Sequence, residues 1–239
     1  MADAYNGYKR GMVVVAHPDD AEFGFSGTVA KFCQQGIEMF YVLCTDGSKG
    51  SSDSKMTPDK LAKIRMKEQR DACDVLGVKD VVFLGYEDAM LVANLDLRRD
   101  IAREIRRFKP DVLICQSPLR SFNATNYLGH PDHLAAAEAT LSAVFPTARD
   151  HLTFPELLKQ GFQPHKVREV LVSGGDHSDT WFDVGDSLDT AIAALKKHVS
   201  QVGGRDAEVE KRMKEWRADA GQPKNIKYAE GFKSFKLRV

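Results

Sequence analysis

Short apolar runs alternate with helical segments along the whole chain, and this alternation restricts its fold more than any other feature. The run Met12-Val-Val-Val-Ala16 is continuously apolar, as is typical of a strand that is buried on both faces of a sheet. Similar runs place the expected strands at residues 12–16, 39–44, 81–84, 112–115 and 170–172. Strands that alternate with helices predict an α/β fold, with a Rossmann-like, mainly parallel sheet and helices on both of its faces.

Helix signals fill the segments between these runs. Thr57 is an expected N-cap followed by Pro58, and Gly77 is expected just beyond the end of the same helix. The other expected helices span residues 24–35, 97–108, 133–144, 188–200 and 206–218. A chain of 239 residues can bury one large core, and no segment rich in proline, glycine and serine divides it. We therefore expect residues 1–239 to form a single domain.

The charge balance and the cysteines argue against several classes of protein. The chain has 34 Lys plus Arg and 34 Asp plus Glu residues, so no global field attracts a polyanion, and nucleic acid is not an expected partner. No apolar run approaches the ~18 residues of a membrane span, and residues 1–10 lack the apolar core of a secretory signal. The four cysteines form no CxxC pair, and free buried thiols are typical of a reducing cytoplasm. We expect a cytoplasmic protein that does not act on a membrane.

An imidazole and several carboxylates follow the first expected strand, in the run His17-Pro18-Asp19-Asp20-Ala21-Glu22. In open parallel sheets, ligands bind at the carboxyl ends of the strands. A dinucleotide site at this turn would need glycines that let the backbone approach a pyrophosphate, whereas carboxylates repel phosphate and attract a divalent cation. Pro18 favours an extended backbone at His17, which helps to fix the direction of the imidazole.

A second cluster, Gly129-His130-Pro131-Asp132-His133, follows the fourth expected strand at the start of a helix. If the first and fourth strands are near neighbours, the two clusters face one cleft. Together they supply imidazoles and carboxylates but no thiolate, and two histidines with one carboxylate leave a position open for water, as in catalytic zinc sites. A lone histidine or an Asp-Asp pair is more often structural, but two such clusters at strand ends of one sheet favour a metal site.

These residues resemble the LmbE/PIG-L family of zinc-dependent deacetylases. The most specific matches are His17-Pro18-Asp19-Asp20 with Glu22 and Gly24, Thr45-Asp46-Gly47, and His130-Pro131-Asp132-His133. Weaker matches at Arg65-x-x-Glu68, His198-x-Ser200-Gln201 and Ala229-Glu230-x-Phe232 extend the resemblance over nearly the whole chain. The family includes the N-acetylglucosaminyl-phosphatidylinositol, mycothiol-pathway and bacillithiol-pathway deacetylases and diacetylchitobiose deacetylase.

The resemblance implies that His17, Asp20 and His133 hold one zinc ion per chain. Asp19 would then be the general base that acts on the zinc-bound water. An aspartate beside such a water can take its proton as the water attacks the amide carbon. Two histidines and an aspartate also accept cobalt, nickel or iron, so the ligand types alone do not decide the metal.

The resemblance also assigns catalytic roles to His130 and Asp132. His130 would be the positively charged partner of the oxyanion and a proton donor to the leaving amine, because a tetrahedral oxyanion needs a donor opposite the attacking water. Asp132 would orient His130 through a carboxylate–imidazole hydrogen bond. Tyr127 lies near the position of a tyrosine that helps to polarise the carbonyl in some family members, but it does not match cleanly and is not assigned a role.

Three further residues, Arg65, Glu22 and His198, are expected to bind substrate. Arg65 and Glu68 fall on the apolar stripe of their helix, where charged groups are costly unless they are paired or belong to a site. Either they form an internal ion pair or Arg65 reaches a sugar hydroxyl or an acidic group, and the resemblance favours the second interpretation. His198 lies at the edge of another apolar stripe, and a half-buried structural histidine is the alternative.

The resulting prediction is hydrolysis of an N-acetyl bond on a small amino-sugar derivative, which releases acetate and a free amine. The nearest alternative is an amidase with the same site and a non-sugar substrate. A non-catalytic metal- or sugar-binding protein is another, although a pure metal site has no need of a spare carboxylate such as Asp19. Two-metal phosphoesterases generally need more ligands than these clusters offer. The resemblance also allows a homo-oligomer, since family members often form hexamers or smaller assemblies.

Overall fold

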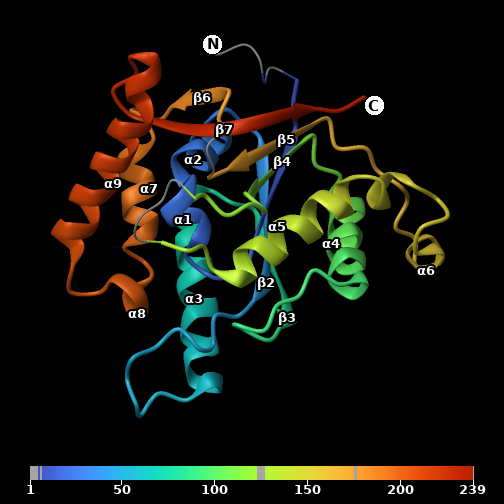
Figure 1. Cartoon of the computed structure of the whole chain (residues 1–239), viewed down its shortest axis with the longest axis horizontal. Helices are drawn as coiled ribbons and strands as arrows, with labels where there is room; N and C mark the ends of the chain where they lie inside the picture. Colours follow the sequence, from blue (N-terminus) through green and yellow to red (C-terminus); the bar gives the residue numbers. More distant parts are fainter. Residues whose placement is uncertain (1–4, 6, 123–126, 175–176, 239) are drawn as a thin grey trace.

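A seven-stranded sheet in the order β3-β2-β1-β4-β5-β7-β6 forms the centre of the molecule (Figure 1). The computed structural model describes residues 5, 7–122, 127–174 and 177–238. Its strands are β1 (Arg10–Val15), β2 (Glu38–Thr45), β3 (Asp80–Tyr86), β4 (Val112–Gln116), β5 (Glu169–Ser173), β6 (Thr180–Asp183) and β7 (Ala229–Lys236). Strands β1 to β5 are parallel, and β7 runs antiparallel to both of its neighbours. The predicted mainly parallel α/β sheet is confirmed.

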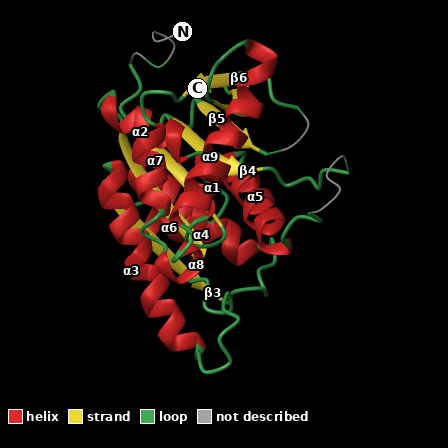
Figure 2. Ribbon diagram, turned by 90° about the vertical axis from the view of Figure 1, so that its left-hand side faces the viewer, coloured by secondary structure: helices red, strands yellow, loops and turns green. Residues whose placement is uncertain are grey.

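Helices cover both faces of this sheet. One face carries α4 (Leu95–Phe108) and α5 (Pro131–Val144). The other carries α1 (Asp20–Gly24), α2 (Ser26–Gln34), α3 (Pro58–Leu76), α7 (Leu188–Leu195) and α9 (Asp206–Gly221). Viewed from the side of this second group, the strands lie behind the helices (Figure 2). Shorter elements are η1 (Thr147–Arg149), α6 (Pro155–Lys159), α8 (Val199–Val202) and η2 (Gln222–Lys224).

The two faces explain why β1 is continuously apolar. Met12 and Val14 pack with α4 residues such as Ile101 in one buried cluster. Val13 and Val15 point the other way and pack in a second cluster that includes α2 residues. Because alternate side chains of a strand point to opposite faces, every position from Met12 to Val15 must be apolar.

The predicted caps of α3 are confirmed, whereas two strands, the short helix α1 and one helix break were not predicted. Thr57 Oγ1 accepts a hydrogen bond from Lys60 N at 3.4 Å, and Gly77 has a left-handed backbone with φ 82°. The helix predicted at 24–35 is confirmed as α2, with the short helix α1 before it, whereas the helix predicted at 188–200 is divided into α7 and α8. Strands β6 and β7 were missed because β6 has only four residues and β7 reads Ala-Glu-Gly-Phe-Lys-Ser-Phe-Lys, with few β-branched residues. None of the helices in the described ranges is long and apolar enough to cross a membrane.

Candidate functional site

The two polar clusters meet where the strand order changes direction. Strands β1 and β4 are hydrogen-bonded neighbours, with Val14 opposite Cys115. The chain continues from β1 toward β2 and from β4 toward β5, on opposite sides, so the two connections diverge and leave a crevice at the carboxyl ends of these strands. His17 follows β1 and Pro131 opens α5 after β4. The predicted cleft depends on β1 and β4 being neighbours in the sheet, and this is confirmed.

The turn between β1 and α1 has an unusual backbone at Asp19. Its φ of 84° and ψ of −20° lie in the left-handed region, which costs free energy for a residue with a side chain. Gln69, on α3, holds this conformation by accepting a hydrogen bond from Asp19 N at 3.0 Å. The next residue, Asp20, starts α1, and its Oδ2 accepts a hydrogen bond from His17 N at 2.8 Å.

Three side chains of the two clusters converge on one point. His17 Nδ1 lies 3.2 Å from His133 Nε2. Asp20 Oδ1 lies 2.9 Å from His133 Nε2, and Asp20 Oδ2 lies 3.5 Å from His17 Nδ1. Donor atoms at about 2.0–2.2 Å from a tetrahedral zinc ion lie roughly 3.3–3.5 Å apart. These three side chains therefore already have spacings close to those of a metal site.

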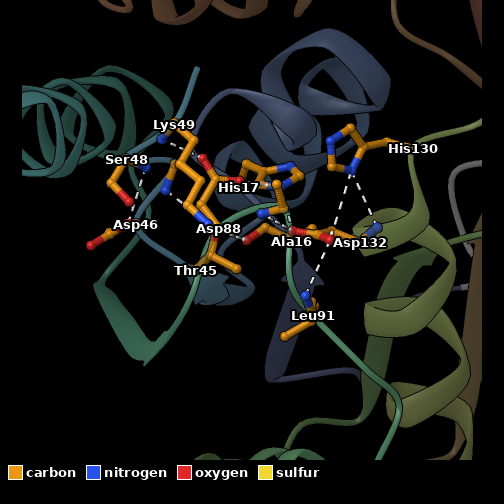
Figure 3. Close-up of polar contacts among 12 residues, drawn as sticks. Ala16, His17, Thr45, Asp46, Ser48, Lys49, Asp88, Leu91, His130 and Asp132 are labelled. Atoms are coloured by element: carbon orange, nitrogen blue, oxygen red, sulfur yellow. Dashed lines mark hydrogen bonds and ion pairs between the residues drawn. The ribbon is translucent and has the colours of Figure 1, made fainter. Parts of the chain in front are cut away.

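The other nitrogen of His17 faces two carboxylates (Figure 3). His17 Nε2 lies 3.1 Å from Asp88 Oδ1 and 3.1 Å from Asp132 Oδ2. Asp132 also accepts backbone hydrogen bonds from Ala89 N at 2.8 Å and Leu91 N at 3.2 Å. Carboxylates that receive an imidazole N–H leave the opposite ring nitrogen free to bind a metal. Sequence reasoning missed Asp88, although it closely follows β3 at the same edge of the sheet.

The site is built to stabilise positive charge. Besides His17, Asp20 and His133, two further sets among the described residues have donor atoms within 4.8 Å of one another and could hold a metal. They are His17 with His130 and His133, and His17 with Asp88 and Asp132. Burial alone would lower the pKa of His17, but hydrogen bonds to Asp20 and Asp88 raise it to about 10. Carboxylates that stabilise a proton on His17 so strongly also favour the binding of a divalent cation.

An unpartnered oxygen next to His133 points to the same conclusion. Gln116 Oε1 is buried without a hydrogen bond, while Gln116 Nε2 lies 3.4 Å from His133 Nδ1. If the amide is turned by 180°, Oε1 accepts a hydrogen bond from His133 Nδ1. His133 Nε2, which faces His17 and Asp20, then carries the lone pair that a metal needs. The donors present therefore fit a metal ion.

Arg65 contacts Asp19 rather than Glu68. Its Nη2 donates to Asp19 Oδ2 at 3.0 Å and to Pro18 O at 2.6 Å, and its Nη1 donates to Gly47 O at 2.9 Å. Glu68 accepts hydrogen bonds from Ser200 N at 2.7 Å and from Ser200 Oγ at 2.6 Å. The alternative of an Arg65–Glu68 ion pair is therefore wrong, and a contact of Arg65 with substrate stays a prediction.

Asp19 has the electrostatics of a proton acceptor. Burial raises the pKa of Asp19 to about 7, although the positive charge of Arg65 acts in the opposite direction. A carboxylate with such a pKa can take and return a proton near neutral pH. In Asp20 the neighbouring imidazoles outweigh the effect of burial and hold the pKa well below its usual range.

His130 is oriented by a backbone group rather than by the Asp132 carboxylate. Asp132 N donates to His130 Nδ1 at 3.2 Å, whereas Asp132 Oδ1 lies 4.0 Å from that nitrogen, too far for a hydrogen bond. The predicted carboxylate–imidazole bond is therefore wrong, because both Asp132 oxygens accept from Ala89, Leu91 and His17. Burial and the nearby His17 lower the pKa of His130. Because Nδ1 accepts from Asp132 N, Nε2 carries the ring proton, and the positive charge expected of His130 stays a prediction.

Tyr127 lies close to both histidines of the second cluster. Its hydroxyl accepts a hydrogen bond from His130 N at 3.0 Å and lies 3.5 Å from His133 Nδ1. The spacing of Tyr127 from the motif gave no clear signal in the sequence, because its approach depends on the path of the loop after β4.

Glu22 and His198 lie behind the site and do not line it. Both side chains are fully buried, with 0% exposure, and Glu22 Oε2 lies 3.3 Å from His198 Nε2. Gln69 Nε2 donates to Glu22 Oε1 at 3.1 Å. Burial would lower the pKa of His198, but the contact with the Glu22 carboxylate raises it above its ordinary value. The predicted substrate contacts of Glu22 and His198 are therefore wrong, because neither side chain has surface that a substrate could touch.

An open cavity of about 360 Å³ lies over these groups. It is lined by His17, Asp19, Asp20, Phe23, Lys49, Gly50, Arg65, Asp88, Ala89, His130, His133 and Gln201. Lys49 Nζ forms an ion pair with Glu87 at 2.8 Å, and Arg65 binds the Asp19 carboxylate. The cavity therefore offers carboxylates and hydrogen-bonding groups rather than free positive side chains. A second cavity of about 260 Å³ meets the first at His133.

The fold and the site together define an α/β protein with a histidine–carboxylate cluster at the switch point of its sheet. Residues 12–144 match the PIG-L family, described as GlcNAc-PI de-N-acetylase. This match covers more than half of the chain, so the protein belongs to the PIG-L family, and the resemblance found in the sequence is confirmed.

Known relatives include deacetylases and one enzyme of another class. The chain is 29% identical over 199 residues to a diacetylchitobiose deacetylase of Thermococcus kodakarensis. The alignment covers 83% of this chain and 72% of the relative. Its structure is similar to that of an N,N'-diacetylchitobiose deacetylase from Pyrococcus horikoshii, with a TM-score of 0.89, 25% identity, and 98% and 86% of the two chains covered. It is also similar to a 4-carboxy-2-hydroxymuconate hydratase from Pseudomonas putida, with a TM-score of 0.77, 25% identity, and 97% and 98% covered.

Proposed function

We propose that the protein is a zinc-dependent hydrolase that removes an N-acetyl group from a small amino-sugar derivative. The observation that carries this proposal is the arrangement at the switch point. Three metal-binding side chains converge there, and a separate carboxylate with a raised pKa lies beside them. The relatives named as deacetylases support the reaction, and their amino-sugar substrates support the substrate class.

In this proposal one zinc ion per chain is held by His17 Nδ1, Asp20 and His133 Nε2. Asp88 and Asp132 receive the proton of His17 Nε2 and so keep the opposite nitrogen free. When bound, the zinc supplies a Lewis acid for the amide carbonyl and lowers the pKa of water to about 7.

The protein side chains account for the proton transfers. Asp19 takes a proton from the attacking water, and Arg65 fixes the direction of its carboxylate. His130 donates from Nε2 to the oxygen on which negative charge develops. Asp19, now protonated, lies in the same cavity as His130 and returns this proton to the leaving amine.

The charge of the cavity favours a neutral, hydroxyl-rich substrate over a polyanion. Asp19, Asp20 and Asp88 line it, while its two cationic side chains, Lys49 and Arg65, are already paired. Carboxylates and amides bind sugar hydroxyls well, whereas an unsaturated polycarboxylate would find no free cation besides the metal. This contrast separates the proposed deacetylase from a hydratase of the kind found among the structural relatives.

An amide with a larger or non-sugar acyl group is a second candidate, and one observation favours it. The cavity that meets the active cleft at His133 extends past Gln116 and Leu119 to a third, mostly apolar cavity of about 250 Å³ that shares Ser117, Leu119 and Gly174 with it. An acyl group longer than acetyl could occupy this space if the carbonyl lies near His133.

A panel assay of free-amine release tests both candidates. N-acetylglucosamine, diacetylchitobiose, N-acetylated thiol-sugar conjugates, an N-octanoyl glucosamine and a non-sugar N-acyl amine are compared, with and without chelator. We expect acetylated amino sugars to be hydrolysed, with loss of activity on chelation and recovery with zinc. Full activity in metal-free protein would contradict the mechanism, and hydration of an unsaturated tricarboxylate without any amine release would contradict the function.

A further inference from the structure

A chain of buried polar groups runs from α8 to the turn that carries Asp19. His198 Nε2 lies 3.3 Å from Glu22 Oε2, Gln69 Nε2 donates to Glu22 Oε1 at 3.1 Å, and Gln69 Oε1 accepts from Asp19 N at 3.0 Å. Glu22 and His198 are 0% exposed and Gln69 is 1% exposed. Burying so many polar groups is costly unless each has a partner. Glu22 and His198 meet as an ion pair without hydrogen-bond geometry, since Glu22 Oε2 and both ring nitrogens of His198 have no hydrogen-bond partner. Of these four residues, only Asp19 lines the cavity.

The contact with Glu22 determines which end of the Gln69 amide faces the turn. A carboxylate only accepts hydrogen bonds, so it selects the NH₂ end of the amide. The carbonyl oxygen of Gln69 must then point toward Asp19 N. In the opposite orientation the amide NH₂ would meet another N–H, and its oxygen would meet a carboxylate. The contact with Glu22 thus makes Gln69 Oε1 the hydrogen-bond acceptor for Asp19 N.

The turn needs this acceptor because Asp19 has a left-handed backbone with φ 84°. Such a conformation persists in a residue with a side chain only when its surroundings hold it. Arg65 lies one helical turn before Gln69 on α3, so the two side chains point the same way. Arg65 binds the Asp19 carboxylate and Pro18 O, while Gln69 binds the Asp19 amide. Helix α3 therefore holds Asp19 by its side chain and by its backbone amide.

We propose that Gln69, oriented by the buried pair of Glu22 and His198, is a positioning residue that sets the backbone of Asp19 and thereby the direction of its carboxylate. This proposal rests on the proposed role of Asp19 as the general base. A misplacement of a reacting group by about 1 Å can cost roughly 10²-fold in rate. The expected signature is therefore a loss of kcat with little change in KM or in metal content.

Four variants test the orientation of the amide. Gln69→Met keeps the shape and removes both hydrogen bonds, so kcat should fall by roughly 10- to 100-fold. Gln69→Glu places two carboxylates together and should be worse. Glu22→Gln frees the amide to turn and should be milder. In the double variant E22Q/Q69E the new carboxylate accepts from both Asp19 N and the new amide, so kcat should recover toward wild type relative to Gln69→Glu.

Ser187→Ala is the matched control for loss of a buried hydrogen bond. Ser187 is 1% exposed and its hydroxyl donates to Gly27 O at 2.7 Å, away from the turn. This variant should lower the melting temperature and leave kcat unchanged. Unchanged kcat in Gln69→Met, with a melting temperature lowered as in the control, would overturn the positioning role. A double variant no more active than Gln69→Glu would overturn the role of Glu22.

Amide hydrogen exchange tests the proposal without any assay of activity. In Gln69→Met the Asp19 amide should exchange at least tenfold faster, while the amide of Val14 on β1 should keep its wild-type rate. If no amide substrate is hydrolysed but the Asp19 amide is selectively deprotected, the proposed function fails and the positioning of the turn stands. Equal protection of Asp19 in both proteins overturns the positioning role whatever the reaction is.

Discussion

Asp19 and Asp20 are neighbours in one turn, yet their surroundings move their pKa values in opposite directions. Two imidazoles flank Asp20 and hold its pKa well below the usual range, so it stays ionised, as a metal ligand must. Burial raises the pKa of Asp19 to about 7 in spite of Arg65, as suits a group that exchanges protons. Two titratable groups whose environments separate their pKa values are typical of paired roles in catalysis.

Substitution of these two residues should separate catalysis from metal binding. Asp19→Asn keeps the shape and removes the base, so kcat should fall by roughly 10²–10⁴-fold while metal content stays near wild type. Asp20→Ala and His133→Ala should lose the metal. Elemental analysis beside kcat measures both effects. A metal-free Asp19→Asn together with a metal-loaded Asp20→Ala would reverse the assignment of ligand and base.

Arg65 should act on kcat through Asp19 rather than on KM through substrate. Arg65→Lys keeps a positive charge but cannot bind Asp19, Pro18 O and Gly47 O at once, so kcat should fall by roughly tenfold or more. Stability should fall as well, because the Asp19 carboxylate loses its partner. Steady-state kinetics and urea unfolding measure the two effects. A rise in KM alone, with kcat unchanged, would instead support the predicted substrate contact.

His165, far from the metal-binding groups, should make stability depend on pH. Its Nε2 lies 2.8 Å from Pro110 O, and burial lowers the pKa of this imidazole below its ordinary value. The unfolded chain therefore binds a proton at a higher pH than the folded chain, and the stability contributed by neutral His165 is lost as the pH falls below about 6.5. The difference in unfolding free energy between wild type and His165→Gln should shrink from pH 8 to pH 5. A constant difference in urea unfolding at these pH values would contradict this.

At the scale of elements, helix α2 depends on a strand far away in the sequence. The first residues of α2 have no side-chain cap of their own. Glu230 on β7 accepts hydrogen bonds from Gly27 N at 3.1 Å and Thr28 N at 2.7 Å, and Arg217 on α9 binds the same carboxylate at 3.0 Å. A carboxylate at a helix N-terminus is favourable, and the buried arginine neutralises it.

Removal of Arg217 should therefore destabilise the whole fold. Arg217→Met leaves the Glu230 carboxylate buried without its counter-charge, which costs about 3–5 kcal/mol. Arg212→Met on the same helix is the control, because Arg212 is exposed and lies 3.7 Å from an exposed glutamate. Its effect should stay within about 0.5 kcal/mol. Equal unfolding free energies of the two variants would show that the buried pair does not hold β7 and α2 together.

The elements that sequence reasoning predicted are those whose signal is local. Strands β1 to β5 each contain the short apolar run that predicted them, and α3 carries its own cap at Thr57. The start of α2 and the partners of β7 depend on contacts between distant parts of the sequence, such as Glu230 capping α2. Residues of the site follow the same rule. His17 and His133 stand in compact motifs, whereas the contacts of Asp88 and Gln69 arise only when separate elements come together.

At the scale of the whole molecule, the proposed metal site joins elements that are more than 100 residues apart in the sequence, from β1 to α5. His17 follows β1, Asp20 starts α1 and His133 lies in the first turn of α5. Asp88, from the segment after β3, completes the group around His17. A cation at this point therefore offsets the repulsion of carboxylates that come from several elements, and it binds the folded chain better than the unfolded one.

Zinc should raise the melting temperature by an amount that its affinity sets. At free zinc 100 times Kd, the folded state gains about 2.7 kcal/mol, which for a domain of this size is roughly 5–11 °C. Asp19→Asn should keep this shift, since Asp19 is not a proposed ligand, and Asp20→Ala should lose it at the same zinc concentration. Calorimetry in zinc-buffered and chelator-treated samples measures the shift without any substrate. Because the shift depends only on binding to the folded chain, a full shift in Asp20→Ala would mean that zinc binds elsewhere, even if the wild-type protein proves to be a deacetylase.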